Sequence, residues 1–382
     1  MRITQKMMID TSRTHLLRQN EQLYNAQHQV SSGKRMTRPS DDPIGMGNRL
    51  DYRSILSGID QHIDTIKMGQ TRLKMTDQTL AVISDFLKSA RAFSREASGP
   101  DATGRAIASE EVANARRQII QLANTRLDDS YLLGGHRTDV PPVSGEGEIV
   151  MRRGRPPELA FGLESAASEV DIEIRDASGT LVRTLSTAGG PGILHETWDG
   201  RNQAGDPVPD GVYKLSAAAE DGFGNPVDVE TYPTYNGDDG DHMAQVAKGQ
   251  TIKINANGGE VFSTTNGMVD ILRVLQDLET ELQKPEGGFN SVKVKALVVE
   301  IDRAMNRIEQ VRARGASRLH RLDATLTFQE GLKPKMEQML ADVEDVDLTR
   351  AIVQLRAQEV AYQAALELTS RVFEPTLMNF LR

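Results

Sequence analysis

Residues 348–373 read LTRAIVQLRAQEVAYQAALELTSRVF, and this stretch decides the fold. Eight of its positions alternate spacings of four and three residues, which places them on one side of a helix. Six of the eight are apolar or aromatic: Leu348, Ile352, Leu355, Tyr362, Leu366 and Phe373. A helix with a single apolar side needs a partner that covers it.

The start of the chain has a matching pattern. Ile9, Leu16, Leu23 and Val30 recur every seven residues and so share one helical seam. A pair made of these two helices alone would still expose Met8, Leu17, Val353 and Val360. We therefore expect the termini to pack on each other and on neighbouring subunits, although one ordinary intramolecular bundle would explain the periodicity as well.

Further helices are predicted on both sides of the middle of the chain. Glycines and prolines interrupt the pattern over 31–47. A seam of apolar residues at intervals of seven then predicts a long helix to about Glu96, and its members are Ile59, Ile66, Leu73, Leu80 and Leu87. Helices are also expected over 106–133, over 267–284 and from about Val294 onwards, with a kink or break near Pro334.

The middle of the chain has another composition. Residues 134–267 hold 21 of the 32 glycines, which favours short strands and turns over long helices. The alternation Val170, Ile172, Ile174 suits a strand with one buried face, and the only tryptophan, Trp198, is expected to anchor a small core. The prediction is an α+β fold in which an antiparallel helical, coiled-coil rod carries an inserted β-rich domain.

Several separated motifs resemble bacterial flagellin-type proteins, and more narrowly the hook-associated family of the hook–filament junction. They are the opening MRIT, RPSDDP over 38–43, YLLGG over 131–135, YNGDDG over 235–240 and EDVD over 344–347. Filament flagellins usually have a segment closer to AKDDAAG where this chain has RPSDDP, so the junction family is the better match. The resemblance covers about 1–143 and 233–382.

The middle resembles a different family. IEIRDASGTLVR over 172–183, WDG over 198–200 and PDGVY over 209–213 are similar to the immunoglobulin-like module of hook-capping proteins. Such modules are small β-sandwiches, which agrees with the predicted short strands. The expected domains are an N-terminal helical half over 1–137, a β-rich region over 138–265 with the immunoglobulin-like module at about 168–232, and a C-terminal helical half over 266–382.

These resemblances imply a structural role outside the cell. They imply a ring of copies of this chain, with a neighbouring hook-associated protein and flagellin as partners. They also imply export through the flagellar type III channel without a cleaved signal peptide, aided by an export chaperone that binds the tail helix. The assembly residues would be those of the two terminal stripes.

Other classes of function find little support in the sequence. The net charge of −9 argues against general attraction to nucleic acid or anionic membrane, and no segment reaches the roughly 18 apolar residues of a membrane span. Neither an enzyme motif nor a cofactor or metal site is expected, and Asp238, Asp239 and Asp241 lack the spacing of a calcium loop. The remaining alternatives are a minor filament flagellin, and an adhesin that binds glycans through Trp198, Tyr213 and Phe223.

Overall fold

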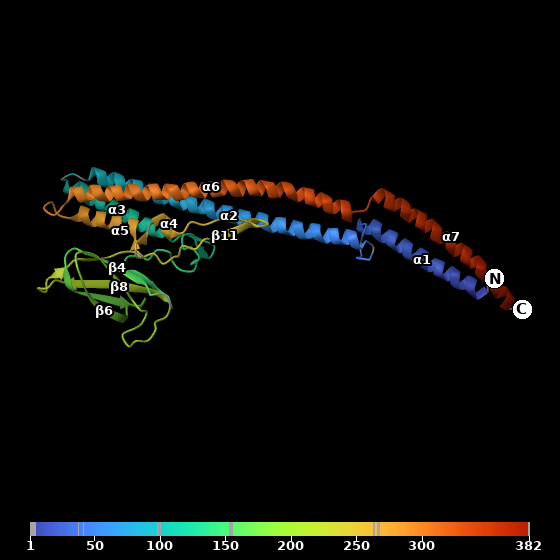
Figure 1. Ribbon diagram of the computed structural model, residues 1–382, viewed down its shortest axis with the longest axis horizontal. Helices are drawn as coiled ribbons and strands as arrows, with labels where there is room; N and C mark the ends of the chain where they lie inside the picture. The colour runs from blue at the N-terminus through green and yellow to red at the C-terminus, as the bar shows by residue number, and fades with distance from the viewer. Residues whose placement is uncertain are drawn as a thin grey trace. The chain divides into compact units, whose positions relative to one another are not determined.

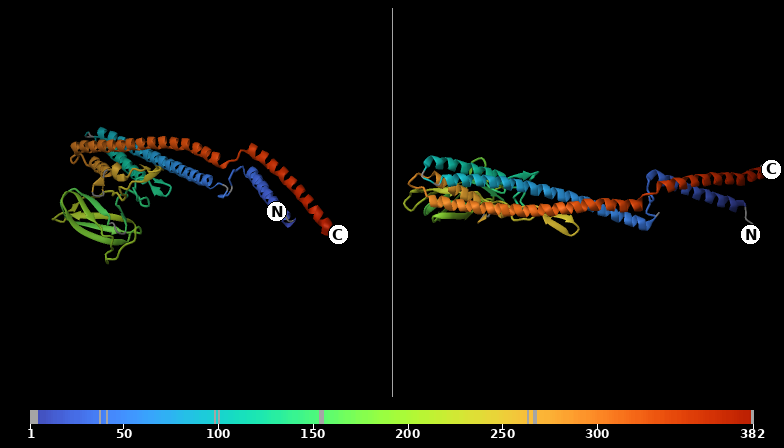
Figure 2. Two further views of the ribbon diagram at one scale, coloured as in Figure 1. Left: turned by 45° about the vertical axis from the view of Figure 1, so that its right-hand side comes forward. Right: turned by 90° about the horizontal axis from the view of Figure 1, so that it is seen from above.

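The computed structural model describes residues 5–36, 38–40, 42–97, 99, 101–152, 156–262, 264–265 and 268–380. Within these ranges, side chains are not described at 5, 6, 8, 9, 264, 265, 268, 269 and 371–380. The chain forms two compact units (Figures 1 and 2). The first joins Met1–Ile63 with Thr327–Arg382, and the second is Asp64–Leu326.

The first unit is helical and brings the two ends of the chain together. Helix α1 (Gln5–Ser32) packs along α7 (Leu348–Phe380), while α2 (Pro43–Glu96) begins and α6 (Ser291–Glu344) ends in the same unit (Figure 1). An isolated antiparallel bridge joins Lys34, just after α1, to Asp345, just before α7. Because α1 runs toward this bridge and α7 runs away from it, the two helices are antiparallel.

The second unit contains the largest apolar core, where α2 and α6 meet α3 (Ala102–Ala123), α4 (Gly258–Phe262) and α5 (Asp270–Gln283). The heptad residues Leu80 and Leu87 are fully buried in it. Ion pairs flank this core, with Arg91 2.6 Å from Asp302 and Arg312 2.9 Å from Asp77. The heptad pattern therefore predicted the buried side of α2 correctly.

The same unit carries a β-sandwich. One sheet has the order β3-β8-β5-β6 with β9 beside β8, and the other has the order β10-β4-β7. The strand bounds are β3 Glu148–Met151, β4 Glu158–Leu163, β5 Ala167–Arg175, β6 Leu181–Gly189, β7 Gly192–Thr197, β8 Gly211–Glu220, β9 Pro226–Val227 and β10 Val229–Thr231. Small hairpins pair β1 (Arg126–Leu127) with β2 (Ser130–Tyr131), β11 (Met243–Ala247) with β12 (Gln250–Lys253), and β13 (Thr264–Thr265) with β14 (Met268–Val269).

The sandwich core agrees with the expectations for its buried residues. Val170, Ile172 and Ile174 on β5 are fully buried, and so is Trp198. The Trp198 indole lies edge-on to Tyr213, with ring centroids 5.1 Å apart, and its Nε1 donates a hydrogen bond to the Arg201 carbonyl. The prediction that Trp198 anchors this core is confirmed.

Polar contacts join the sandwich to α5. The Tyr232 hydroxyl donates to Asp277 at 2.9 Å, and Thr280 donates to Glu230 at 2.6 Å. Burial, with the negative charges of Asp277 and Glu230 close by, raises the pKa of Tyr232 far above its usual value, so the phenol stays a donor. The immunoglobulin-like module is thus attached through hydrogen bonds rather than through a shared apolar core.

Three expectations about element boundaries were wrong. The helix expected over 106–133 ends at Asn124, because the Asn124 side chain exchanges two hydrogen bonds with the Val143 backbone and the chain then turns into β1. Helix α6 continues through Pro334 and ends at Glu344; Pro334 and Glu330 are exposed, so water can replace the lost helical hydrogen bond. The sandwich begins at Glu148 instead of about 168, since β3 pairs with β8.

Tyr235 organises the loop that follows the sandwich. Its hydroxyl donates to the Leu133 carbonyl and accepts from the Gly258 amide, both at 2.9 Å. A Cβ atom added at Gly258 would lie 2.2 Å from the Tyr235 ring, so a side chain has no room there. The tyrosine thereby ties the loop after β10 to the start of α4.

Gly258→Ala should lower the free energy of unfolding of the second unit by about 2 kcal/mol, because the new methyl group must displace the Tyr235 ring. Chemical denaturation followed by circular dichroism measures this change. Gly287→Ala is the matched control, since nothing lies within 4 Å of the added atom. Equal stability of the two variants would contradict the tight packing described here.

Candidate functional site: terminal helices and the turn that joins them

The seam between α1 and α7 contains part of the predicted stripes. On α1 it includes Ala26, which is buried, and Leu16, Leu23 and Val30, which are half-buried. On α7 it includes Ala351, which is buried, and Leu355 and Tyr362, which are half-buried. The side chains of Ile9 and Phe373, also predicted, lie outside the described part of the chain.

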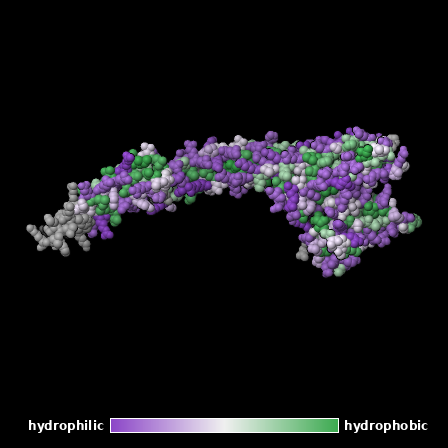
Figure 3. Space-filling view, turned by 180° about the vertical axis from the view of Figure 1, so that it is seen from behind, coloured by the Kyte–Doolittle hydropathy of each residue, from purple (hydrophilic) through white to green (hydrophobic). Residues whose placement is uncertain are grey.

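Other apolar side chains of this helix pair face away from the seam. From the predicted tail stripe these are Leu348, Ile352 and Leu366, which are 51%, 43% and 45% exposed. Leu17, Tyr24, Val353, Val360 and Leu368 are also exposed, each by more than half of its surface. Figure 3 shows hydrophobic residues along the terminal helices. The pair thus leaves apolar surface on both of its members.

The tail stripe is therefore divided between two faces, a division that its spacing did not predict. Sequence reasoning also missed Tyr24 and Leu368 as exposed apolar residues. Tyr24 and Leu368 lie outside the two predicted stripes. The signal that could have revealed them is the presence of further apolar residues on other faces of the same two helices.

A double turn joins the seam to the neighbouring helices of the first unit. Gly33 has a φ of +67°, a left-handed conformation that favours glycine, and it ends α1. The Arg35 amide donates to the Glu344 carbonyl at 2.8 Å, and the Val346 amide donates to the Gly33 carbonyl at 3.0 Å. The turn between α1 and α2 is thereby fastened to the turn between α6 and α7.

The Glu344 carboxylate lies at the centre of this double turn and is only 2% exposed. Arg49 and Arg53 each approach it to 2.9 Å, and Lys34 approaches it to 3.4 Å. Burial alone would raise the pKa of Glu344, but the three cations outweigh it and hold that pKa below its usual value. Glu344 thus stays ionised at neutral pH and neutralises cations from two other segments.

Asp42 begins α2 on the opposite side of the turn. Its carboxylate accepts a hydrogen bond from the Gly45 amide at 2.9 Å and pairs with Arg35 at 3.2 Å, and these interactions lower its pKa. Asp42 therefore caps the start of α2. Asp41, the other carboxylate of the RPSDDP segment, lies outside the described residues.

Glu344→Gln should destabilise the double turn at neutral pH and remove most of its acid sensitivity. A carboxyl whose folded pKa is lowered contributes stability above its unfolded value of about 4.3, and the contribution disappears as the pH falls through the folded pKa. Amide hydrogen exchange around Gly33 and Val346 between pH 7 and pH 3 would measure this, after correction for intrinsic rates. Asp342→Asn, at an exposed carboxylate of α6, is the control; unchanged pH dependence in Glu344→Gln would disprove the assignment.

The residues of the glycan-binding alternative do not form one site. Trp198 and Tyr213 are buried inside the sandwich, whereas Phe223 is 93% exposed on the loop between β8 and β9. An aromatic platform needs exposed rings next to each other. The structure therefore contradicts this alternative as it was formulated.

Two carboxylates of the acidic loop over 238–241 already interact with other groups of the protein. Asp238 accepts from the amides of His136 and Gly240 at 2.7 and 2.9 Å, and Asp241 pairs with Lys253 at 2.5 Å. Within the described ranges, no group of three or more histidine or acidic side chains has the arrangement of a metal site. The described helices include none that is long and apolar enough to cross a membrane.

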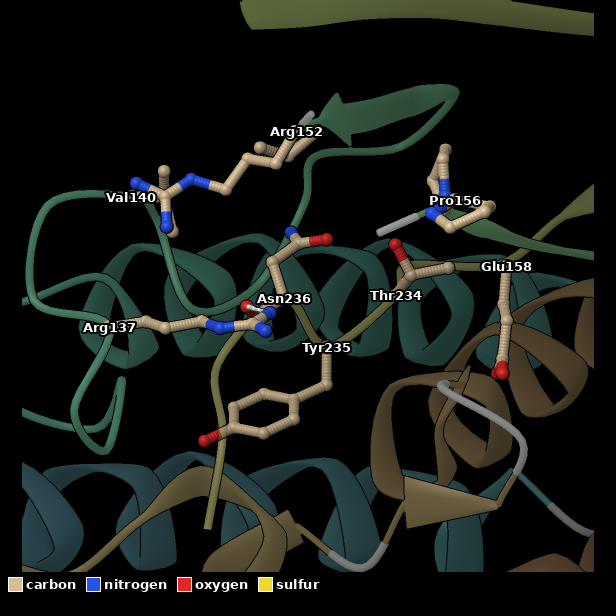
Figure 4. A pocket seen from close by; sticks show the side chains of 10 residues that line it. Arg137, Val140, Arg152, Pro156, Glu158, Thr234, Tyr235 and Asn236 are labelled. Atoms are coloured by element: carbon tan, nitrogen blue, oxygen red, sulfur yellow. Dashed lines mark hydrogen bonds between the residues drawn. The ribbon is translucent and has the colours of Figure 1, made fainter. Parts of the chain in front are cut away.

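One concave site lies between the sandwich and the loop that Tyr235 organises (Figure 4). Arg137, Arg152, Pro157 and Asn236 are among the residues that line it. Its volume is about 60 Å³, far below the roughly 300–1,000 Å³ of small-molecule sites. Its two arginines are also engaged in ion pairs with Asp238 and Asp139. The site is therefore a poor match for a cofactor or substrate.

Comparisons with known families agree with this arrangement. Residues 3–138 match the family model of the bacterial flagellin N-terminal helical region, and residues 150–222 match that of the FlgD Ig-like domain. The second match begins close to β3, in agreement with the early start of the sandwich. No curated protein matches the chain significantly.

The chain is similar to solved structures of flagellar proteins, and the first of those below has the same overall fold. A Vibrio parahaemolyticus protein assigned to the flagellar hook-associated proteins is 18% identical, with a TM-score of 0.53 over 80% of this chain and 100% of that chain. Bacillus cereus FlgL is 13% identical, with a TM-score of 0.45 over 76% of this chain and 99% of that chain. FlgD from P. aeruginosa is 21% identical, with a TM-score of 0.23 over 29% of this chain and 80% of that chain.

The two family models match successive parts of the chain, in the order helical region and then sandwich, and both describe flagellar proteins. Helices α1 to α3 lie within the first match, and most of the sandwich lies within the second. The expected α+β fold with an inserted immunoglobulin-like module is confirmed. The chain therefore combines a stretch that matches the bacterial flagellin N-terminal helical region with a stretch that matches the FlgD Ig-like domain, and the second lies between its two helical halves.

Proposed function

We propose that this protein is an adaptor of the hook–filament junction and that copies of it form a ring through their terminal helices. The observation that carries the proposal is the incomplete coverage of apolar residues by the α1 and α7 pair. Leu355 and Tyr362 are half-buried in the seam, while Val353, Val360 and Leu368 are each about two-thirds exposed. Exposed apolar surface of this extent on two adjoining helices is typical of a protein interaction site.

The driving force for such a ring would be burial of these residues. Each Val or Leu side chain that passes from water into an interface contributes about 1.5–3 kcal/mol. The six exposed apolar residues of α7 could thus supply on the order of 10 kcal/mol per subunit before the entropy of association is subtracted. Burial of this extent would favour assembly if neighbouring subunits covered both faces of the pair.

The partners follow from this role. A neighbouring hook-associated protein would lie on the hook side of the ring, and flagellin would lie on the filament side. During export, a flagellar chaperone would cover the apolar stripe of α7 in the manner of a groove that binds an amphipathic helix. The protein would then act outside the cell, after export without a cleaved signal peptide. Its role would be mechanical, and we assign it no catalytic residue.

The domain boundaries that we propose remain those of the sequence analysis, with helical halves over 1–137 and 266–382 and a β-rich region over 138–265. The assembly residues that we propose are the ten of the two terminal stripes, together with Val353, Val360 and Leu368. Like Leu348, Ile352 and Leu366 of the original set, the three additions are exposed on α7.

Purified protein mixed with isolated hook–basal bodies tests the proposal. Labelled-antibody electron microscopy should show the protein at the distal ends of hooks, and flagellin added afterwards should extend a filament from those ends. Incorporation along the whole length of growing filaments would favour the minor flagellin instead. Absence of the label from hooks and filaments would refute both functions.

A further inference from the structure

We propose that Gln19 on α1 and Gln358 on α7 form a buried polar layer that specifies the partner and the alignment of these helices, at a cost in stability. Both residues are partly buried in the pair, and the amide oxygen of each is sealed from solvent. Among the described residues, no donor reaches either oxygen. The two unpartnered oxygens occur in a seam that is otherwise built from apolar and small residues.

The spacing of the helices places the two glutamines at the same level. Gln19 lies seven residues before the buried Ala26, and Gln358 lies seven residues after the buried Ala351. In an antiparallel pair, equal steps away from facing positions lead to facing positions. Measured from the bridge between Lys34 and Asp345, both glutamines lie about 20 Å along their helices.

The residues on either side of the two glutamines along the seam are apolar or aromatic. Alternating steps of three and four residues along the heptads place Leu23 near the level of Leu355 on one side of the glutamines, and Leu16 near the level of Tyr362 on the other. An apolar residue at 19 and at 358 would therefore continue an apolar seam. Unsatisfied buried amide groups are costly, whereas two facing amides can satisfy each other when one turns its NH2 group toward the other oxygen.

A polar layer of this kind affects which helix can pair in the seam and in which alignment. When glutamine faces glutamine, one amide can donate to the other once its NH2 group turns toward that oxygen; when glutamine faces leucine, no such hydrogen bond can form. A helix that is shifted along the seam, or a foreign helix with an apolar residue at this level, is therefore penalised. Single polar layers in coiled coils fix alignment and partner in this way and lower stability.

The consequence for ring formation rests on the proposed function, but the layer itself does not. If the protein joins hooks, the layer would keep each terminal helix from pairing out of alignment with the helices of its neighbours. The layer can be tested on the isolated full-length chain, so its failure and the failure of the junction role are distinguishable.

A double-mutant cycle with Gln19→Leu and Gln358→Leu tests the layer through amide hydrogen exchange in α1 and α7. Each single variant should exchange about tenfold faster than the natural sequence, because one amide then faces leucine. The double variant should exchange more slowly than the natural sequence, since its seam is continuously apolar. The effect of the double variant would thus be opposite in sign to the effect of each single variant.

The matched control uses exposed glutamines on the same two helices, Gln22→Leu and Gln363→Leu. These variants should change exchange by less than twofold, alone or together. If the seam glutamines behave like this control, or if their effects simply add, the proposal is overturned. A double variant that exchanges faster than both single variants would likewise overturn it, since the glutamines would then be net stabilising.

Discussion

Leu355→Asp combined with Tyr362→Asp should abolish attachment to hooks and separate α1 from α7. Both side chains are half-buried in the seam, and each substitution removes apolar burial and introduces a charge there. The lost burial alone amounts to roughly 4 kcal/mol, which corresponds to a loss of association of about a thousandfold. The cost of desolvating two carboxylates adds to this loss. Counting labelled hook ends by electron microscopy, and following helix content by circular dichroism, would measure both effects.

The control for this variant uses the same helix and the same new charges. Gln354→Asp with Gln363→Asp alters two exposed positions of α7 and should leave the seam intact. Normal hook attachment by the seam variant would show that α7 is not an assembly helix. Equal loss in the seam variant and the control would show that the added negative charge, rather than the seam, is responsible.

Trp198→Ala should unfold the immunoglobulin-like module while the helical part of the chain stays folded. Trp198 is completely buried, and its ring packs against Tyr213. Truncation of a buried large aromatic residue costs about 3–5 kcal/mol, a large share of the 5–15 kcal/mol that stabilises a typical domain. The links from the module to α5 are hydrogen bonds, so unfolding of the module need not disrupt the helical core. Limited proteolysis with mass spectrometry would locate new cleavage between 148 and 231.

Phe223→Ala provides a matched aromatic control within the same module. Phe223 is 93% exposed, so its truncation should change module stability by less than about 0.5 kcal/mol. If Trp198→Ala also lowered the helix content, the module and the helices would form one cooperative unit. If it left the module resistant to protease, the tryptophan would not be the core anchor.

The helical part of the fold could be predicted in detail because heptad spacing is a local property. Leu80 and Leu87 were placed on the buried side of α2 by counting residues, and the structure buries them fully. Boundaries were harder to predict. Asn124 ends α3 through hydrogen bonds to Val143, a residue that is far enough along the chain to leave no local pattern.

The candidate site could be predicted only in part. The terminal stripes were visible in the sequence, but their spacing could not show that Leu355 and Tyr362 face α1 while Ile352 and Leu366 face outward. The EDVD motif was noticed, yet the role of Glu344 was not. Its partners Arg49 and Arg53 lie 295 and 291 residues away in the chain, and nothing in the sequence pairs them.

By itself, the sequence determined that two helical halves flank a β-rich region, and that the two ends of the chain carry apolar stripes. These properties depend on residue periodicity and composition within a single segment. The tertiary structure alone decided which side of each stripe is covered, how three cations surround Glu344, and that Gln19 and Gln358 lie at the same level of one seam. Such properties arise when segments from distant parts of the chain come into contact, and burial and charge pairing then depend on all of them together.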